Sequence, residues 1–150
     1  MDPRRSDRVE RLGWRTRLAL VVAALGLGGV LGLARWLEPD PRGYGTHTQL
    51  GLRPCAFAQL TGEPCPTCGM TTAFAWSMRG RFVHAWRANP VGSLLAPVCV
   101  VLIPWLLGSA LIGRPWGCRT LDQPLILLVV ATVASSLLAW TIRMLLRRVL

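Results

Sequence analysis

Three long stretches of the chain are apolar and almost free of charge, and polar segments separate them. They cover residues 18–37, 91–112 and 125–142. A helix needs about 20 apolar residues to cross the hydrocarbon core of a bilayer. The pattern therefore predicts an all-α integral membrane protein with about three transmembrane helices, built as a single membrane domain over residues 1–150.

The first stretch follows a basic arm, residues 1–17, which carries six arginines and which we expect to stay in the cytoplasm. With the arm in the cytoplasm, equal numbers of arginines lie on the two sides of the membrane. The predicted orientation therefore depends only on the arginines that flank the first span. A cleavable signal peptide is the alternative, because Gly32, Leu33 and Ala34 resemble a cleavage site. The long charged arm and the long apolar stretch favour a retained helix.

Small residues recur at four-residue intervals on two of the predicted spans, and such strips let helix backbones approach closely. They are Ala24, Gly28 and Gly32 in the first span and Ala131, Ser135 and Ala139 in the third. We expect the two strips to face each other. The alternative is that Gly and Ala are simply frequent in membrane helices.

Residues 38–90 join the first two spans and hold most of the polar variety of the chain. In their last part a large apolar residue recurs every four positions, at Met70, Phe74, Met78, Phe82 and Trp86. This spacing predicts one or two short amphipathic helices, broken near Gly80, that lie along the membrane surface. A short helix packed inside the bundle, hinged at Asn89 and Pro90, is the alternative.

The composition and charge of the chain indicate which kinds of molecule it contacts. The chain is 52% hydrophobic, carries a formal charge of +10, and all 17 of its basic residues are arginine. The arginines flank the apolar stretches and form no aromatic-interleaved stripe, which argues against nucleic-acid binding. We expect the lipid bilayer and its anionic head groups as partners, together with another membrane protein. Arginine without lysine is typical of a GC-rich bacterial genome, so the expected location is the bacterial plasma membrane, as a multi-pass protein.

Three of the five cysteines lie close together in the sequence of this loop: Cys55, Cys65 and Cys68. The spacing of the last two lets both sulfurs point into one site. A zinc site would use all three sulfurs, with His47 or His84 as the fourth ligand. A disulfide would need two sulfurs and an oxidising compartment. A redox-active pair would need one thiolate of lowered pKa, which the start of the following helix could provide.

We expect the cysteines to have a structural role, as a zinc site or a disulfide, in a non-enzymatic membrane protein that acts as an accessory protein or subunit. No other catalytic set or phosphate-binding loop is visible, and no cofactor besides zinc is indicated. The alternative is a membrane thiol-disulfide oxidoreductase. In it, Cys65 or Cys68 exchanges with partner thiols and Cys55 resolves the mixed disulfide.

The residues around the cysteines also form a family-like pattern. It consists of Cys55, Phe57, Leu60–Gly62, Pro64–Thr71, Ala73, Phe74, Gly80, Ala85, Asn89 and Pro90. The pattern resembles DUF2752, a family of small bacterial membrane proteins of unknown function. The resemblance implies a membrane location and three cysteines that act as a unit, and it implies no activity. This chain has Thr72 where the family commonly has Arg, and Arg81 where it often has an acid.

Overall fold

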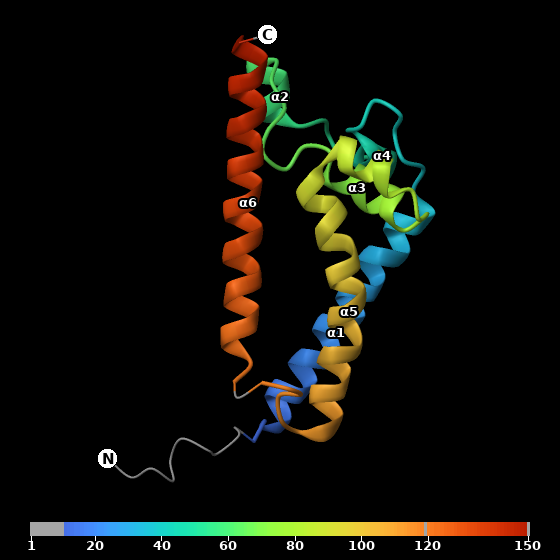
Figure 1. The fold of residues 1–150 in the computed structure, drawn as a ribbon. Coiled ribbons are helices and arrows are strands. Elements are labelled where there is room, and N and C mark those ends of the chain that lie inside the picture. The colour runs from blue at the N-terminus through green and yellow to red at the C-terminus, as the bar shows by residue number, and fades with distance from the viewer. Residues whose placement is uncertain (1–10, 119, 150) are drawn as a thin grey trace, which may run out of the picture.

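The computed structural model describes residues 11–118 and 120–149, and all regular secondary structure within them is helical (Figure 1). The elements are α1 (Trp14–Trp36), the short 3-10 helix η2 (Thr46–Leu50), α2 (Ala56–Thr61), α3 (Met70–Ser77), α4 (Phe82–Ala88), α5 (Pro90–Ile112) and α6 (Asp122–Val149). The helices α1, α5 and α6 are long and apolar enough to cross a membrane. The predicted all-α membrane fold is therefore confirmed.

The helices α1 and α5 pack against each other and bury two apolar clusters between them. The cluster nearer the chain start holds Leu20, Ala24, Leu106 and Ala110, and the other holds Leu31, Ala34, Phe74, Ala96 and Cys99. Alanine on both helices lets the backbones approach, which is how membrane helices associate without a hydrophobic driving force between them. The helix α5 continues through Pro97 and Pro104 without a break.

The two small-residue strips do not face each other, so that expectation is wrong. Within the described residues α6 contacts α5 and makes no contact with α1. On α1 only Ala24 of its strip is buried, and it faces α5, while Gly28 and Gly32 are exposed. The four-residue spacing of small residues therefore did not predict which helix packs against α1. Alanines outside the strip, such as Ala34, also contribute to the α1–α5 contact.

At the chain-start end, α1 begins at Trp14, so the last part of the predicted basic arm is helical. Arg17 donates hydrogen bonds from Nε to the Ala110 carbonyl and from Nη2 to the Leu111 carbonyl, the second at 3.2 Å. Carbonyls in the last turn of a helix have no helical donor, and a cation there also interacts favourably with the helix dipole. This arginine therefore stabilises the end of α5.

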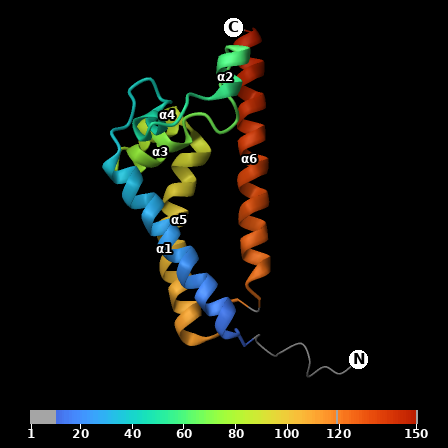
Figure 2. The same cartoon turned by 180° about the vertical axis from the view of Figure 1, so that it is seen from behind.

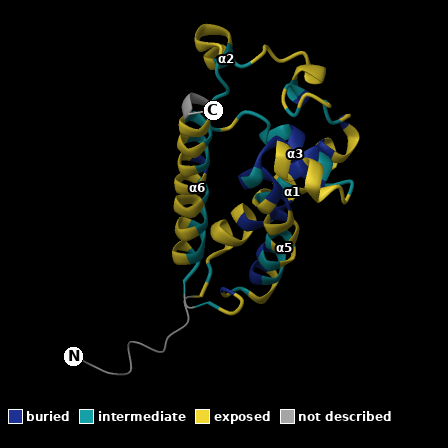
Figure 3. Ribbon diagram, turned by 45° about the horizontal axis from the view of Figure 1, so that its top comes forward, coloured by how far each residue is buried: buried dark blue, intermediate teal, exposed yellow. Residues whose placement is uncertain are grey.

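The helix α6 stands beside the α1–α5 pair, and its surface is largely exposed (Figures 1, 2 and 3). Its 28 residues extend about 42 Å, more than the roughly 30 Å of hydrocarbon in a bilayer. Near its C-terminal end, Trp140 donates from Nε1 to the Pro64 carbonyl at 2.8 Å and meets the ring of Phe57 edge-on. The top of α6 is thus attached to the segment that carries the cysteines.

Residues 38–89, which we call the head, cover the end of the bundle where α1 finishes and α5 begins (Figure 1). The predicted pair of short helices is present, and Gly80 between them has a positive φ of 72°. The helix α3 is buried against α1 and α5, as in the alternative of a helix inside the bundle. The helix α4 buries only Ala85 and Ala88 and leaves Phe82, Val83 and Trp86 exposed.

Candidate metal centre

The segment Cys65–Gly69 is a pair of overlapping turns that leads into α3. The Cys68 N–H donates to the Cys65 carbonyl at 3.1 Å, and the Met70 N–H donates to the Thr67 carbonyl at the same distance. Gly69 has a φ of 82°, and a Cβ there would lie 2.5 Å from the Ala88 carbonyl oxygen. Only glycine fits this position, because of both the positive φ and the contact. The motif is therefore held directly against the end of α4.

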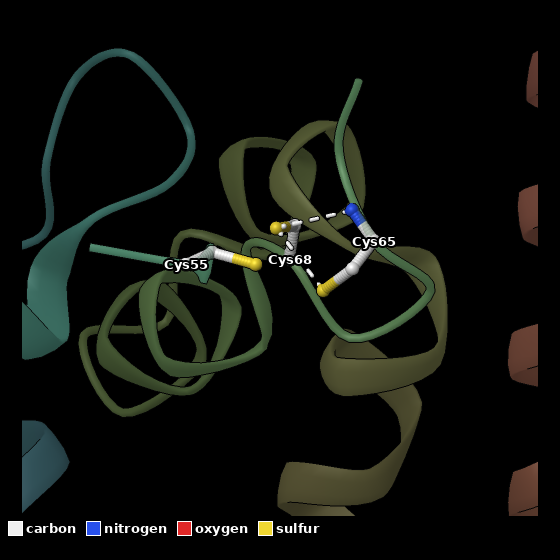
Figure 4. A group of neighbouring side chains, drawn as sticks. All are labelled: Cys55, Cys65 and Cys68. Atoms are coloured by element: carbon white, nitrogen blue, oxygen red, sulfur yellow. Dashed lines mark hydrogen bonds between the residues drawn. The ribbon is translucent and has the colours of Figure 1, made fainter. Parts of the chain in front are cut away.

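The three loop cysteines meet at this turn. Their Sγ atoms all lie within 4.8 Å of one another, and each side chain is half-buried. Cys55 lies just before α2, and its sulfur points toward the other two (Figure 4). The sulfurs of Cys65 and Cys68 are 3.2 Å apart, whereas a disulfide bond is about 2.05 Å long. The cluster is thus a set of three free thiols that could hold a metal ion.

Asn89 fixes this turn to the first turn of α5. Its side chain is only 1% exposed. The amide Nδ2 donates to the Cys68 carbonyl at 3.1 Å, and Oδ1 accepts from the Gly92 N–H at 3.0 Å, as an N-cap does. One buried side chain therefore starts α5 and positions Cys68. The sequence marked Asn89 as part of a hinge and of the family-like pattern, and did not predict its contact with Cys68.

The surroundings of the two motif thiols separate their acidities. Burial raises the pKa of Cys65, but hydrogen bonds with the Thr67 hydroxyl, at 3.3 Å, and with the Cys68 and Cys55 thiols lower it to about 7. Burial and the hydrogen bond with Cys65 raise the pKa of Cys68 to about 12. Cys65 is therefore the thiolate of the pair near neutral pH. The hydroxyl and the thiols lower this pKa, a cause that the helix-start argument from the sequence did not include.

The two histidines lie in different surroundings. His47, in η2, lines the same cavity as the three cysteines, and its Nε2 is 3.3 Å from the Arg53 carbonyl oxygen. His84, in α4, stacks on Trp76 with ring centroids 4.9 Å apart. Neither histidine belongs to the group of three sulfurs that the structure brings together.

The cysteines open onto a cavity of about 820 Å³. Its walls come from η2 and the loop before it, from α2, from the Cys65–Gly69 turn, from the end of α4, and from Arg143 of α6. A cavity of this size is typical of a site for a small molecule. The three cysteines therefore line a cavity in which a ligand from outside the chain could approach the sulfurs.

Two further residues of the site were not identified as contacts by the sequence. Thr72, where the resembling family commonly has Arg, is fully buried, and its hydroxyl lies 2.8 Å from the hydroxyl of Thr46. This hydrogen bond joins α3 to η2, which also carries His47. The other is Trp140, which holds Pro64 from α6. Trp140 and Pro64 are so far apart in the sequence that no local sequence pattern indicates their contact.

Comparison with known families confirms the resemblance. Residues 55–103 match the model of DUF2752, a family described as proteins of unknown function. The DUF2752 match contains the three clustered cysteines, Asn89 and most of α5. It does not extend to α1 or α6. No curated protein and no solved structure matches the chain.

The double role of Asn89 can be separated by two substitutions. Asn89→Ala removes both hydrogen bonds of the side chain, so we expect the free energy of unfolding in detergent to fall by about 1–3 kcal/mol. Asn89→Asp keeps the acceptor for Gly92, so α5 should still begin at the same residue. It replaces the donor to Cys68 with a buried carboxylate oxygen that faces the Cys68 carbonyl, so the turn should loosen and the cysteines should become more mobile. The measurements are unfolding midpoints and alkylation rates of the clustered thiols. Identical behaviour of the two variants would contradict the double role.

The separated acidities predict which thiol reacts. In reduced, metal-free protein, alkylation at Cys65 should rise with pH through a midpoint of about 7, because the thiolate is the reactive form. Cys68 should stay unreactive until strongly alkaline pH, since its proton is retained. Mass spectrometry of the labelled peptides measures both, with Cys65→Ser as the control that removes the neutral-pH labelling. Equal midpoints for Cys65 and Cys68 would contradict the assignment.

Proposed function

We propose that this is a multi-pass membrane protein in which Cys55, Cys65 and Cys68 hold a zinc ion. The observation that carries the proposal is the convergence of three free sulfurs within 4.8 Å of one another. Zinc bound by thiolates takes Zn–S distances of about 2.3 Å and tetrahedral angles, which places neighbouring sulfurs about 3.8 Å apart. The separations in the cluster are compatible with this after small side-chain rotations.

The site chemistry supports a soft, thiophilic ion. Thiolates select zinc or copper(I) over magnesium or calcium, which prefer oxygen ligands. A thiol of lowered pKa, such as Cys65, loses its proton to a metal at little cost at neutral pH. His47 lines the cavity next to the sulfurs, so we propose it as the fourth ligand in preference to His84, which stacks on Trp76.

A bound ion would join segments that otherwise have few contacts. Cys55 precedes the short helix α2, which has no buried residue, whereas Cys68 is fixed to α5 through Asn89. A metal bridging them would attach α2, and with it the top of α6, to the α1–α5 pair. The proposed role is thus structural, and the protein acts as an accessory protein or subunit in the bacterial plasma membrane. Its partners are the lipid bilayer, the anionic head groups and another membrane protein.

The proposal predicts one zinc ion per chain in protein purified in detergent. Cys55→Ser, Cys65→Ser and Cys68→Ser should each lower the zinc content at least tenfold, because each removes one of the three sulfur ligands from the proposed four-coordinate site. Cys118→Ser is the matched control, since Cys118 lies outside the cluster, and it should retain the metal. His47→Ala should weaken binding and His84→Ala should not. Metal-free protein with three readily alkylated thiols would contradict the zinc site.

A second candidate function is thiol-disulfide exchange, and the separated pKa values of the motif thiols favour it. The Cys65 thiolate would attack a disulfide of a partner protein, forming a mixed disulfide and releasing one partner thiolate. Cys68, 3.2 Å away, would then attack the Cys65 sulfur. This second step releases the other partner thiol and leaves a Cys65–Cys68 disulfide. Cys68 therefore resolves the intermediate in this scheme, rather than Cys55.

Exchange activity makes a distinct prediction. Cys68→Ser should trap a mixed disulfide between Cys65 and a model disulfide substrate, because the resolving thiol is missing. Cys65→Ser should trap none. Non-reducing gels and peptide mass spectrometry detect the adduct. Cys55 also lies near Cys65, so the decisive variant is the double substitution Cys55→Ser and Cys68→Ser: if it traps no adduct in metal-free protein, the exchange function is excluded, and the zinc proposal is unaffected.

A further inference from the structure

We propose that the cavity beside the cysteines binds a phosphate group, carried either by a membrane lipid or by a soluble compound. Three arginines from separate elements line it: Arg42 from the loop after α1, Arg87 from α4 and Arg143 from α6. Among the described residues that line it, none is Asp or Glu. A cavity walled by cations from three directions favours an anion, and the proposal does not depend on the metal.

The three arginines do not contribute equally. Arg42 is bound to Asp40, with Nη2 2.7 Å from Oδ2, so its charge is largely compensated. Arg87 is exposed, and no hydrogen bond or ion pair joins its side chain to the part of the chain that the structure describes. Its guanidinium is thus available to a ligand. Arg87 is the residue on which the proposal depends most.

The type of donor points to phosphate. A guanidinium presents parallel N–H groups that match two oxygens of a phosphate, and arginine is the usual choice for such recognition. Residues with uncharged donor groups line the same cavity, among them Tyr44 and Gln59. A tetrahedral group with several oxygens can accept from donors on several sides at once.

The position of the cavity agrees with a lipid source. Arg143 is the first charged residue after the uncharged part of α6, and α1 ends with an exposed Trp36, a residue type common at membrane interfaces. The cavity therefore lies near the level of the lipid head groups. Its volume of about 820 Å³ can hold a head group or a small phosphorylated compound.

The experiment compares full-length protein with two arginine variants. Arg87→Gln removes a cavity charge. Arg53→Gln is the matched control, because Arg53 is exposed and does not line the cavity. The probes are nanodiscs of phosphatidylglycerol or phosphatidylcholine, with retained lipid counted by native mass spectrometry, and pyrophosphate, with binding measured by calorimetry. Zinc content and unfolding midpoint of each variant show whether the fold and the metal site are intact.

Phosphatidylglycerol retained over phosphatidylcholine, about tenfold less in Arg87→Gln and unchanged in Arg53→Gln, supports a lipid head group. Pyrophosphate binding with the same dependence on Arg87, without a lipid preference, supports a soluble phosphate compound. Equal loss in both variants indicates only general charge attraction and overturns the proposal. Absence of binding to both probes by intact wild-type protein overturns it as well. If intact wild-type protein binds the anion but contains no zinc, the proposed metal site is contradicted and the anion site is not.

Discussion

Asn89 is the junction on which the head of the molecule depends, because its buried amide serves two segments at once. It starts α5 by accepting from Gly92, and it holds the Cys65–Gly69 turn by donating to Cys68. The turn can come this close only because Gly69 has no Cβ. Because both polar atoms of this buried side chain are hydrogen-bonded, the start of α5 determines where the turn lies.

The second span is in turn fixed by its contact with α1, where alanines and a few large apolar residues fill the interface. The cysteine cluster therefore lies at the end of the helix pair where α5 begins. Cys55 reaches this end from a short helix of its own, and Trp140 connects α6 to the same place. The three sulfurs meet where three otherwise separate parts of the chain converge.

This convergence explains why the two proposed chemistries involve the same site. A neighbouring hydroxyl and two thiols favour the thiolate of Cys65, and a thiolate is both the better metal ligand and the better nucleophile. A bound ion would occupy the sulfur that exchange requires, so the two uses compete for the same atoms. Arg42, Arg87 and Arg143 line the same cavity as the three sulfurs.

The sequence by itself determined the three spans, the break at Gly80 and the grouping of the cysteines. These follow from local properties: the transfer of long apolar runs into hydrocarbon, a glycine with positive φ, and the spacing of Cys65 and Cys68. Only the tertiary structure decided that α1 packs on α5, that α3 is buried, and that Asn89 and Trp140 hold the site. Those contacts join residues far apart in the chain, and burial and hydrogen bonding across such distances leave no periodic pattern.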